Sequence, residues 1–204
     1  MMQIQKANIR KIILDVSRVE FLEKGYKNTS MRTIAKKSGV GLSNTYNYFK
    51  NKDEILKEVL KHLLQAFDIL IDEHNSPEYI SLDIFISKEY MQKQINIFVE
   101  FILKYREELK LLLFKVHGSS LDNFNEEYTN RHTKIGLEYI DKMKEKYPQI
   151  NTNISDFFIH TISSWWLSII GEIVSHDLSD EKIKQFISEY MVYATAGWKK
   201  ILKI

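Results

Sequence analysis

The sequence predicts an all-α protein of about nine helices, in which a small helix-turn-helix domain precedes a larger helical domain. Apolar residues recur at helical spacing in every long segment, and no strand-like alternation extends beyond a few residues. Only two prolines and seven glycines occur among the 204 residues, so long helices are seldom interrupted. Serine, threonine or asparagine precedes several predicted helices, as N-caps do.

The first helix is expected over residues 6–24 and ends before Gly25, a typical C-terminal residue. Its apolar residues fall on one helical face: Ile9, Ile12, Ile13, Val16 and Val19. The second helix begins after Thr29 or Ser30, either of which is a good N-cap, and ends at Gly39.

A short third helix is expected over residues 42–49. Asn51 then has the character of an N-cap with Glu54 three residues later, which predicts a capping box and a helix extending to about residue 73. Two short helices joined by a tight, glycine-containing turn form a helix-turn-helix. We therefore predict two domains, residues 1–52 and residues 53–204.

Helical spacing continues to the C-terminus. Five further helices are expected, over residues 84–104, 107–117, 121–146, 154–176 and 180–202. Ser179 is the expected N-cap of the last one.

The last two helices carry more apolar surface than one buried face requires. Small residues at Ser164, Ser168 and Gly171 would allow another backbone to approach closely. We therefore predict that these helices form half of a four-helix bundle between two copies of the chain. The predicted interface residues are Trp165, Ile169, Ile173, Ile187, Tyr190, Met191, Ala194 and Trp198.

The net charge of +2 conceals an asymmetry along the chain. Residues 1–52 contain 11 Lys and Arg but 3 Asp and Glu, whereas residues 53–204 contain 18 and 24. A basic N-terminal region indicates a polyanionic partner.

The absence of cysteine excludes disulfides and thiol catalysis and suits a reducing cytoplasm. We see no signal peptide and no run of about 18–20 apolar residues, so we expect a cytoplasmic location and no membrane partner.

Signals for enzymes are weak. Gly39 and Gly41 lack the third glycine of a dinucleotide-binding loop and follow a helix instead of a strand. Residues 175–177 are a contiguous serine, histidine and aspartate, whereas triad residues converge from separate positions. Glu172 and His176 stand four residues apart without a third metal ligand. We predict no catalytic residue, no metal and no cofactor. The alternatives are an enzyme with its site in the C-terminal domain and a helical module that binds a different protein.

The helix-turn-helix segment is rich in cations and neutral hydrogen-bond donors, the groups that bind DNA phosphates. These residues are Arg32, Lys36, Lys37, Asn44, Tyr46, Asn47, Tyr48, Lys50 and Lys52. In a major groove, Leu42 and Ser43 at the start of the second short helix would meet base edges, with Asn47 one turn later. Arg32 is suited to bidentate bonding with guanine.

Residues of about 9–56 resemble the DNA-binding domain of the TetR family. The resemblance is carried by the order and spacing of Phe21, Gly25, Ile34, Ala35, Gly39, Val40, Tyr46, Phe49 and Lys52. It implies an all-helical homodimeric regulator, usually a repressor, that a small molecule releases from a palindromic operator. By position, base contacts are implied for Arg32, Leu42, Ser43 and Asn47. Phosphate contacts or packing of the recognition helix are implied for Thr29, Ser30, Asn44, Tyr46, Tyr48 and Lys52.

The sequence also departs from the family pattern. Gly41 replaces the serine-like cap of the recognition helix, Ser43 replaces a glycine or proline, and Thr45 replaces a leucine. Arg18 and Glu20 stand where the first helix is often apolar.

The C-terminal domain contains aromatic residues with a few polar ends, as apolar ligand pockets do. We predict lining roles for Phe67, Phe98, Phe101, Tyr105, Phe114, His117, Tyr139 and Trp166. The same stripes also fit an ordinary core, so the effector hypothesis depends mainly on the family resemblance.

Overall fold

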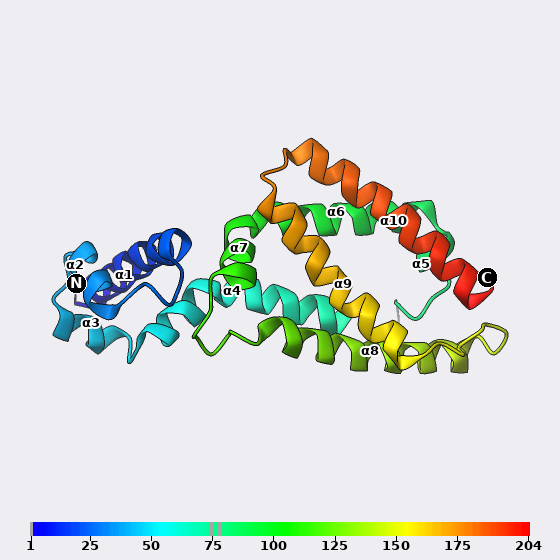
Figure 1. Ribbon diagram of the computed structural model, residues 1–204, viewed down its shortest axis with the longest axis horizontal. Helices are drawn as coiled ribbons and strands as arrows, with labels where there is room; N and C mark the ends of the chain where they lie inside the picture. Colours follow the sequence, from blue (N-terminus) through cyan, green and yellow to red (C-terminus); the bar gives the residue numbers. More distant parts are fainter. Residues whose placement is uncertain (1, 74–75, 77–78) are drawn as a thin grey trace. The chain divides into compact units, whose positions relative to one another are not determined.

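In the computed structural model, which describes residues 2–73, 76 and 79–204, every regular element is a helix (Figure 1). The predicted all-α class is therefore confirmed. The helices are α1 (Met2–Lys24), α2 (Met31–Ser38), α3 (Leu42–Tyr48), α4 (Lys52–Glu73), α5 (Asp83–Ile86), α6 (Lys88–Lys104), α7 (Arg106–Phe114), α8 (Phe124–Lys146), α9 (Asp156–Ser175) and α10 (Asp180–Leu202).

One predicted helix is two helices. The single helix expected over residues 84–104 is divided at Ser87, whose backbone is extended at φ −81° and ψ 122°. The Ser87 hydroxyl oxygen accepts a hydrogen bond from the backbone N of Tyr90 at 3.1 Å, so Ser87 is the N-cap of α6. The four residues of α5 form a separate turn of helix before it. The described part of the chain thus has ten helices instead of nine.

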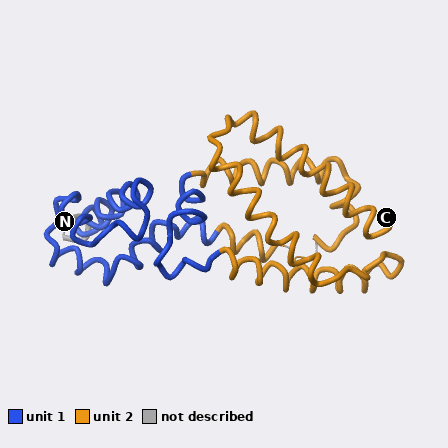
Figure 2. The backbone as a smooth tube through the Cα atoms, viewed as in Figure 1, with its two compact units in different colours: residues 1–65, 107–124 blue, residues 66–106, 125–204 orange. Residues whose placement is uncertain are grey.

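The chain divides into two compact units (Figure 2). The first consists of residues 1–65 and 107–124, and the second of residues 66–106 and 125–204. Helix α4 contributes to the first unit up to Gln65 and to the second from Ala66. The functional boundary between residues 52 and 53 stays a prediction.

In the first unit, the amphipathic faces of α1, α2 and α4 meet α7 in one core. Phe21, Ile34, Leu56 and Leu109 are completely buried. The backbone N of Tyr26 donates to the Lys115 carbonyl at 2.8 Å, which attaches the segment after α7 to the turn after α1. The first unit therefore includes the helix-turn-helix and a later segment of the chain, residues 107–124, that packs against it.

The second unit contains α10 packed against α5 and α6. One of its buried clusters consists of Ile140, Met143, Ile150, Ile159 and Leu202. In the described part of the chain, α9 is long and apolar enough to cross a membrane, contrary to the sequence-based expectation. Half of that stretch is buried within the fold, as in the core helix of a globular protein.

Candidate functional site

The turn between α2 and α3 has the predicted geometry. Ser30 caps α2, because its hydroxyl oxygen accepts a hydrogen bond from the backbone N of Thr33 at 3.1 Å. Gly39 ends α2 at φ 67°, a left-handed conformation that favours glycine. Gly41 then opens α3 as an N-cap with no side-chain hydrogen bond. The two short helices are thus joined by a three-residue turn, which confirms the helix-turn-helix motif.

Helix α3 has one buried and one exposed side. Thr45 is completely buried, and its hydroxyl donates to the Gly41 carbonyl at 3.2 Å. The threonine that replaces a leucine is therefore satisfied within its own helix. The exposed residues are Leu42, Ser43, Asn44, Tyr46 and Asn47, and Tyr48 is half-buried. Asn47 Nδ2 donates to Asn44 Oδ1 at 3.4 Å, so two amides are paired on the exposed side.

Two cations next to α3 are also exposed. Arg32 on α2 has no hydrogen-bond or ion-pair partner in the part of the chain that the structure describes, so its guanidinium is available to a ligand. Lys50 follows α3, and its backbone N donates to Glu54 Oε2 at 2.6 Å. The backbone N of Glu54 in turn donates to Asn51 Oδ1 at 2.8 Å, so the predicted cap of α4 is formed.

Two residues predicted for the DNA-binding set make their hydrogen bonds inside the first unit. The buried Thr29 hydroxyl lies 2.9 Å from the Gly25 carbonyl that accepts its hydrogen bond. Lys52 Nζ donates to the carbonyls of Tyr26 and Thr29, both at 2.6 Å, and lies 3.9 Å from the centroid of the Tyr26 ring. Burial lowers the pKa of the Lys52 ammonium. Both side chains stabilise the connection between α1 and α2.

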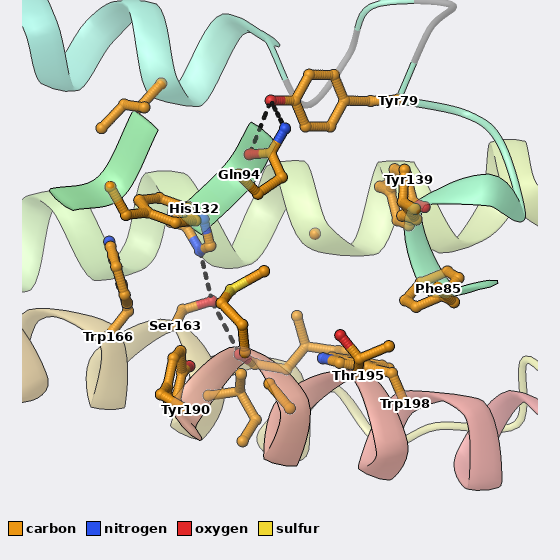
Figure 3. Close-up of a pocket in the computed structure, with 18 of the residues that line it drawn as sticks. Tyr79, Phe85, Gln94, His132, Tyr139, Ser163, Trp166, Tyr190, Thr195 and Trp198 are labelled. Atoms are coloured by element: carbon orange, nitrogen blue, oxygen red, sulfur yellow. Dashed lines mark hydrogen bonds between the residues drawn. The ribbon is translucent and has the colours of Figure 1, made fainter. Parts of the chain in front are cut away.

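The second unit contains a cavity of about 270 Å³ (Figure 3). Nine of its 21 lining residues are aromatic, and none is Asp, Glu, Lys or Arg. Four long helices line it: α6 with Phe98, α8 with Tyr139, α9 with Trp166 and α10 with Trp198. The Phe98 and Trp166 rings lie 4.7 Å apart between centroids, so aromatic faces adjoin one another along the lining.

Polar groups at the cavity occur mainly in pairs. Gln94 Nε2 donates to the Tyr79 hydroxyl oxygen at 3.1 Å. Ser163 Oγ donates to the Ile159 carbonyl at 2.9 Å and therefore accepts from His132 Nδ1, 3.0 Å away. The hydroxyls of Tyr90 and Tyr139 are different, because both are buried and neither has a hydrogen-bond partner among the described residues. Burial raises the pKa of the Tyr139 phenol.

The predicted pocket residues are found in different places. Phe98, Tyr139 and Trp166 line the cavity, whereas Phe67, Phe101 and Tyr105 do not. Phe67 and Phe101 are buried against each other, with ring centroids 5.2 Å apart.

Phe114 and His117 lie in the first unit instead of at the cavity, and both are exposed. His117 Nδ1 is 3.1 Å from the Asp122 carboxylate. Sequence reasoning found Tyr139 of the α8 wall but missed its other lining residues, although a regular signal was present: the lining residues of α8 recur every three or four positions as Tyr128, His132, Gly136, Tyr139 and Ile140.

Helices α9 and α10 also present an exposed apolar face, which we define as Phe157, Trp165, Phe186 and Tyr193. Phe157 is 77% exposed and Tyr193 63%. Small residues accompany them on the surface at Ser164, Ser168 and Gly197.

Of the eight residues predicted for a dimer interface, only Trp165 belongs to this exposed apolar face. Ile169, Ile173 and Ile187 are buried within their own chain, so their place in an interface stays a prediction. The other four, Tyr190, Met191, Ala194 and Trp198, line the cavity.

Comparison with known proteins identifies the family. Residues 13–59 match the model of the bacterial regulatory proteins of the tetR family. The HTH-type transcriptional repressor KstR2 of Mycolicibacterium smegmatis is 30% identical over 201 residues, which cover 95% of this chain and 92% of the repressor. The chain belongs to the TetR family of transcriptional regulators.

A further relative and a solved structure are also similar to this chain. YhgD, an HTH-type transcriptional regulator of Bacillus subtilis, is 37% identical over 68 residues, which span 33% of this chain and only 36% of YhgD. A crystal structure assigned to the TetR family from Syntrophomonas wolfei has a TM-score of 0.63 at 20% identity, covering 94% of this chain and 96% of that one. These relatives are regulators, and the structural likeness supports the all-helical fold.

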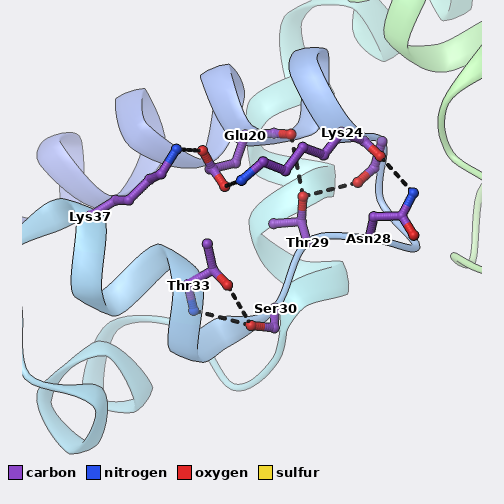
Figure 4. A network of polar contacts seen from close by, with 8 residues as sticks. Glu20, Lys24, Asn28, Thr29, Ser30, Thr33 and Lys37 are labelled. Carbon is purple, nitrogen blue, oxygen red and sulfur yellow. Dashed lines mark hydrogen bonds and ion pairs between the residues drawn. The ribbon is translucent and has the colours of Figure 1, made fainter.

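The two charged residues that depart from the TetR pattern in α1 have partners. Arg18 Nε donates to Glu108 Oε1 on α7 at 2.7 Å. Glu20 is completely buried and accepts hydrogen bonds from Lys24 on its own helix and from Lys37 on α2 (Figure 4). The hydrogen bond from Lys37 contributes most to lowering the pKa of the Glu20 carboxyl. Both departures thus fasten α1 to neighbouring helices.

We expect Glu20→Gln to lower the free energy of unfolding by about 1–2 kcal/mol at pH 7, because two charge-assisted hydrogen bonds are weakened while both lysines stay half-exposed. The Glu20 pKa is lower in the folded state than in the unfolded chain, where it is about 4.3. The carboxylate therefore stabilises the fold above about pH 4.3, and this contribution is lost as the pH falls through the folded-state value.

Urea unfolding across this pH range would measure the effect. Glu23→Gln removes the same charge from an exposed position of α1 and is the matched control. An equal loss for both variants, or a Glu20→Gln loss that persists unchanged in acid, would contradict the proposed pairing.

Proposed function

We propose that this chain is a homodimeric repressor that binds a palindromic DNA operator and releases it when a small molecule occupies the cavity. The observation that carries the proposal is the exposed side of α3. Five of its side chains face solvent, those of Leu42, Ser43, Asn44, Tyr46 and Asn47, and the guanidinium of Arg32 on α2 is exposed and unpartnered in the described part of the chain. Thr45, on the other side of α3, anchors the helix to the first unit. A rigidly held helix that presents polar side chains is what major-groove recognition requires.

The charges around this helix favour DNA over other partners. Residues 1–52 carry 11 Lys and Arg against 3 Asp and Glu. Phosphate neutralisation by such residues releases counterions and makes affinity fall steeply with salt. An enzyme with its site in the C-terminal domain has no reason to show this dependence. Since the proposed ligand is genomic DNA, we place the protein in the cytoplasm.

Helix α10 suggests how an effector would act. One side of α10 lines the cavity with Met191 and Ala194, and another side presents Phe186 and Tyr193 in the exposed apolar face. A ligand that moves α10 would therefore also alter the proposed contact between two copies. To work as an inducer it must bind the form with low DNA affinity more tightly, by about 1–3 kcal/mol for couplings of this kind.

Selection of bound duplexes from a random DNA pool tests the DNA-binding part. We expect a palindrome whose half-site centres are about 34 Å apart, one helical turn of DNA, and an inverse salt dependence of affinity. Recovery of single half-sites would contradict a dimeric repressor. Affinity that is unaffected by salt and sequence would contradict the entire proposal.

We expect Arg32→Ala to reduce affinity for the selected operator by about 1–3 kcal/mol and to relax the preference at one base pair. The reason is that Arg32 is exposed and unpartnered in the described part of the chain, so its guanidinium is free for bidentate bonding. Lys36→Ala removes the same charge from an exposed position of α2 and should weaken all sequences alike. Fluorescence anisotropy with operator and single-mismatch duplexes distinguishes the two. An equal loss on every sequence for Arg32→Ala would reassign Arg32 to a phosphate.

A further inference from the structure

The lining of the cavity restricts what it can bind. We propose that it takes an uncharged, largely apolar compound of one or two rings, and that the Tyr139 hydroxyl forms the main hydrogen bond with it. The inference depends on the proposed function, because it names the chemical class of the effector. It is carried by the uncharged lining and by the unpartnered Tyr139 hydroxyl.

The charge of the ligand follows from the lining. With no lysine or arginine among the lining residues, a carboxylate or phosphate would lose its hydration without gaining a cationic partner. A cation would find aromatic faces, but the nearest carboxylate reached through the polar groups is Glu73, whose Oε2 lies behind the Tyr79 hydroxyl at 3.4 Å. Glu73 is not a lining residue. An uncharged molecule therefore loses the least hydration energy on entry.

The size and shape of the ligand follow from the walls. The volume of about 270 Å³ lies just below the range of about 300–1,000 Å³ for drug-sized ligands. Flat aromatic walls favour flat rings, which stack or meet edge to face with Phe98, Trp166 and Trp198. Close packing of α8 on α9 sets one boundary, because a Cβ on Gly136 would lie only 2.9 Å from Ile159 Cγ2.

The hydrogen bond is assigned to a buried lining hydroxyl that has no partner. Gln94 is bonded to Tyr79, and His132 is bonded to Ser163. Two lining hydroxyls, those of Tyr90 and Tyr139, are buried without a partner among the described residues. We assign the hydrogen bond to Tyr139, because the Tyr90 ring lies against Tyr79, with centroids 6.0 Å apart, beside the bonded pair of Tyr79 and Gln94. A buried hydroxyl without a partner is costly, so a ligand that bonds to it gains more than the hydrogen bond is worth in water. The label for Tyr139 in Figure 3 marks its place on the α8 wall.

Four probes that share one ring system test the ligand class: naphthalene, 2-naphthol, 2-naphthoate and 2-naphthylmethylammonium. We expect calorimetry with the full chain at pH 7, without DNA, to show 2-naphthol binding at least about tenfold more tightly than either ion. Tyr139→Phe should weaken 2-naphthol about threefold to tenfold and change naphthalene by less than about twofold. Tightest binding of an ion, or absence of binding by 2-naphthol, would overturn the proposal. So would an equal effect of Tyr139→Phe on 2-naphthol and naphthalene.

A matched pair of variants tests the location. Ala194→Phe adds a ring to the cavity wall and should abolish 2-naphthol binding. Ile69→Phe makes a similar addition on the exposed surface of α4 and should leave binding unchanged. If both variants bind normally, the ligand is elsewhere and the assignment fails.

Operator affinity is measured separately, in the presence and in the absence of 2-naphthol. Normal 2-naphthol binding with unchanged operator affinity would support the ligand class and contradict the regulatory part of the proposed function.

Discussion

Trp165→Glu is expected to convert the proposed dimer into a monomer and to reduce operator affinity at least a hundredfold. Trp165 is 42% exposed and belongs to the exposed apolar face, with the Tyr193 ring centroid 6.1 Å away. In a two-fold symmetric interface each copy would bury the carboxylate of the introduced glutamate in the same apolar, water-excluding contact. Burying charge without a partner costs at least about 3 kcal/mol, which corresponds to more than a hundredfold loss of dimerisation. A monomer would bind only one half-site.

Sedimentation velocity gives the mass of each variant, and anisotropy with the selected operator gives its affinity. Ile69→Glu, at a 58% exposed position of α4, introduces the same charge outside the exposed apolar face and should stay dimeric. Circular dichroism verifies that both variants keep their helices. A Trp165→Glu protein that is still a dimer would place the interface elsewhere, and a monomeric wild type would contradict the homodimer itself.

The limits of sequence reasoning are clearest at α9 and α10. The excess of apolar residues distinguished these helices from the others, but their apolar residues recur every three or four positions over a wide stripe. Phe157 and Ile173 belong to the same four-residue column, yet Phe157 faces solvent and Ile173 is buried in the core, so the period alone does not separate the two environments. The cavity adds a third environment on α10, where Ala194 lines it. Assigning each column requires the packing of α5 and α6 against α10, which is not encoded locally.

The helix-turn-helix was predicted more completely because its signals are local. The caps at Ser30 and Asn51 and the left-handed Gly39 each depend on residues within a few positions. The ion pair between Glu20 and Lys37 joins positions 17 apart in different helices, so neither residue alone indicates its partner. The family resemblance indicated a charged residue in a place that is often apolar, and only the fold explains it.

The same limit affects Lys52, for which the sequence suggested a phosphate contact. We expect Lys52→Met to lower the free energy of unfolding of the first unit by about 2–4 kcal/mol. The substitution removes the ammonium that donates at 2.6 Å to the carbonyls of Tyr26 and Thr29 and that lies over the Tyr26 ring. Hydrogen bonds with a charged donor contribute about 1.5–3 kcal/mol each, and the lost burial cost of the charge offsets part of that loss.

Urea unfolding at fixed protein concentration measures the stability, and hydrogen exchange should reveal faster opening of the turn between α1 and α2. Lys50→Met removes the same charge from an exposed position two residues earlier and should leave stability within about 0.5 kcal/mol. If Lys52 acts instead as a phosphate contact, its removal will leave unfolding unchanged and lower the salt slope of DNA binding by about one. The internal bonds of Lys52 favour the first outcome, because an ammonium directed at two carbonyls of its own chain must abandon them to reach DNA.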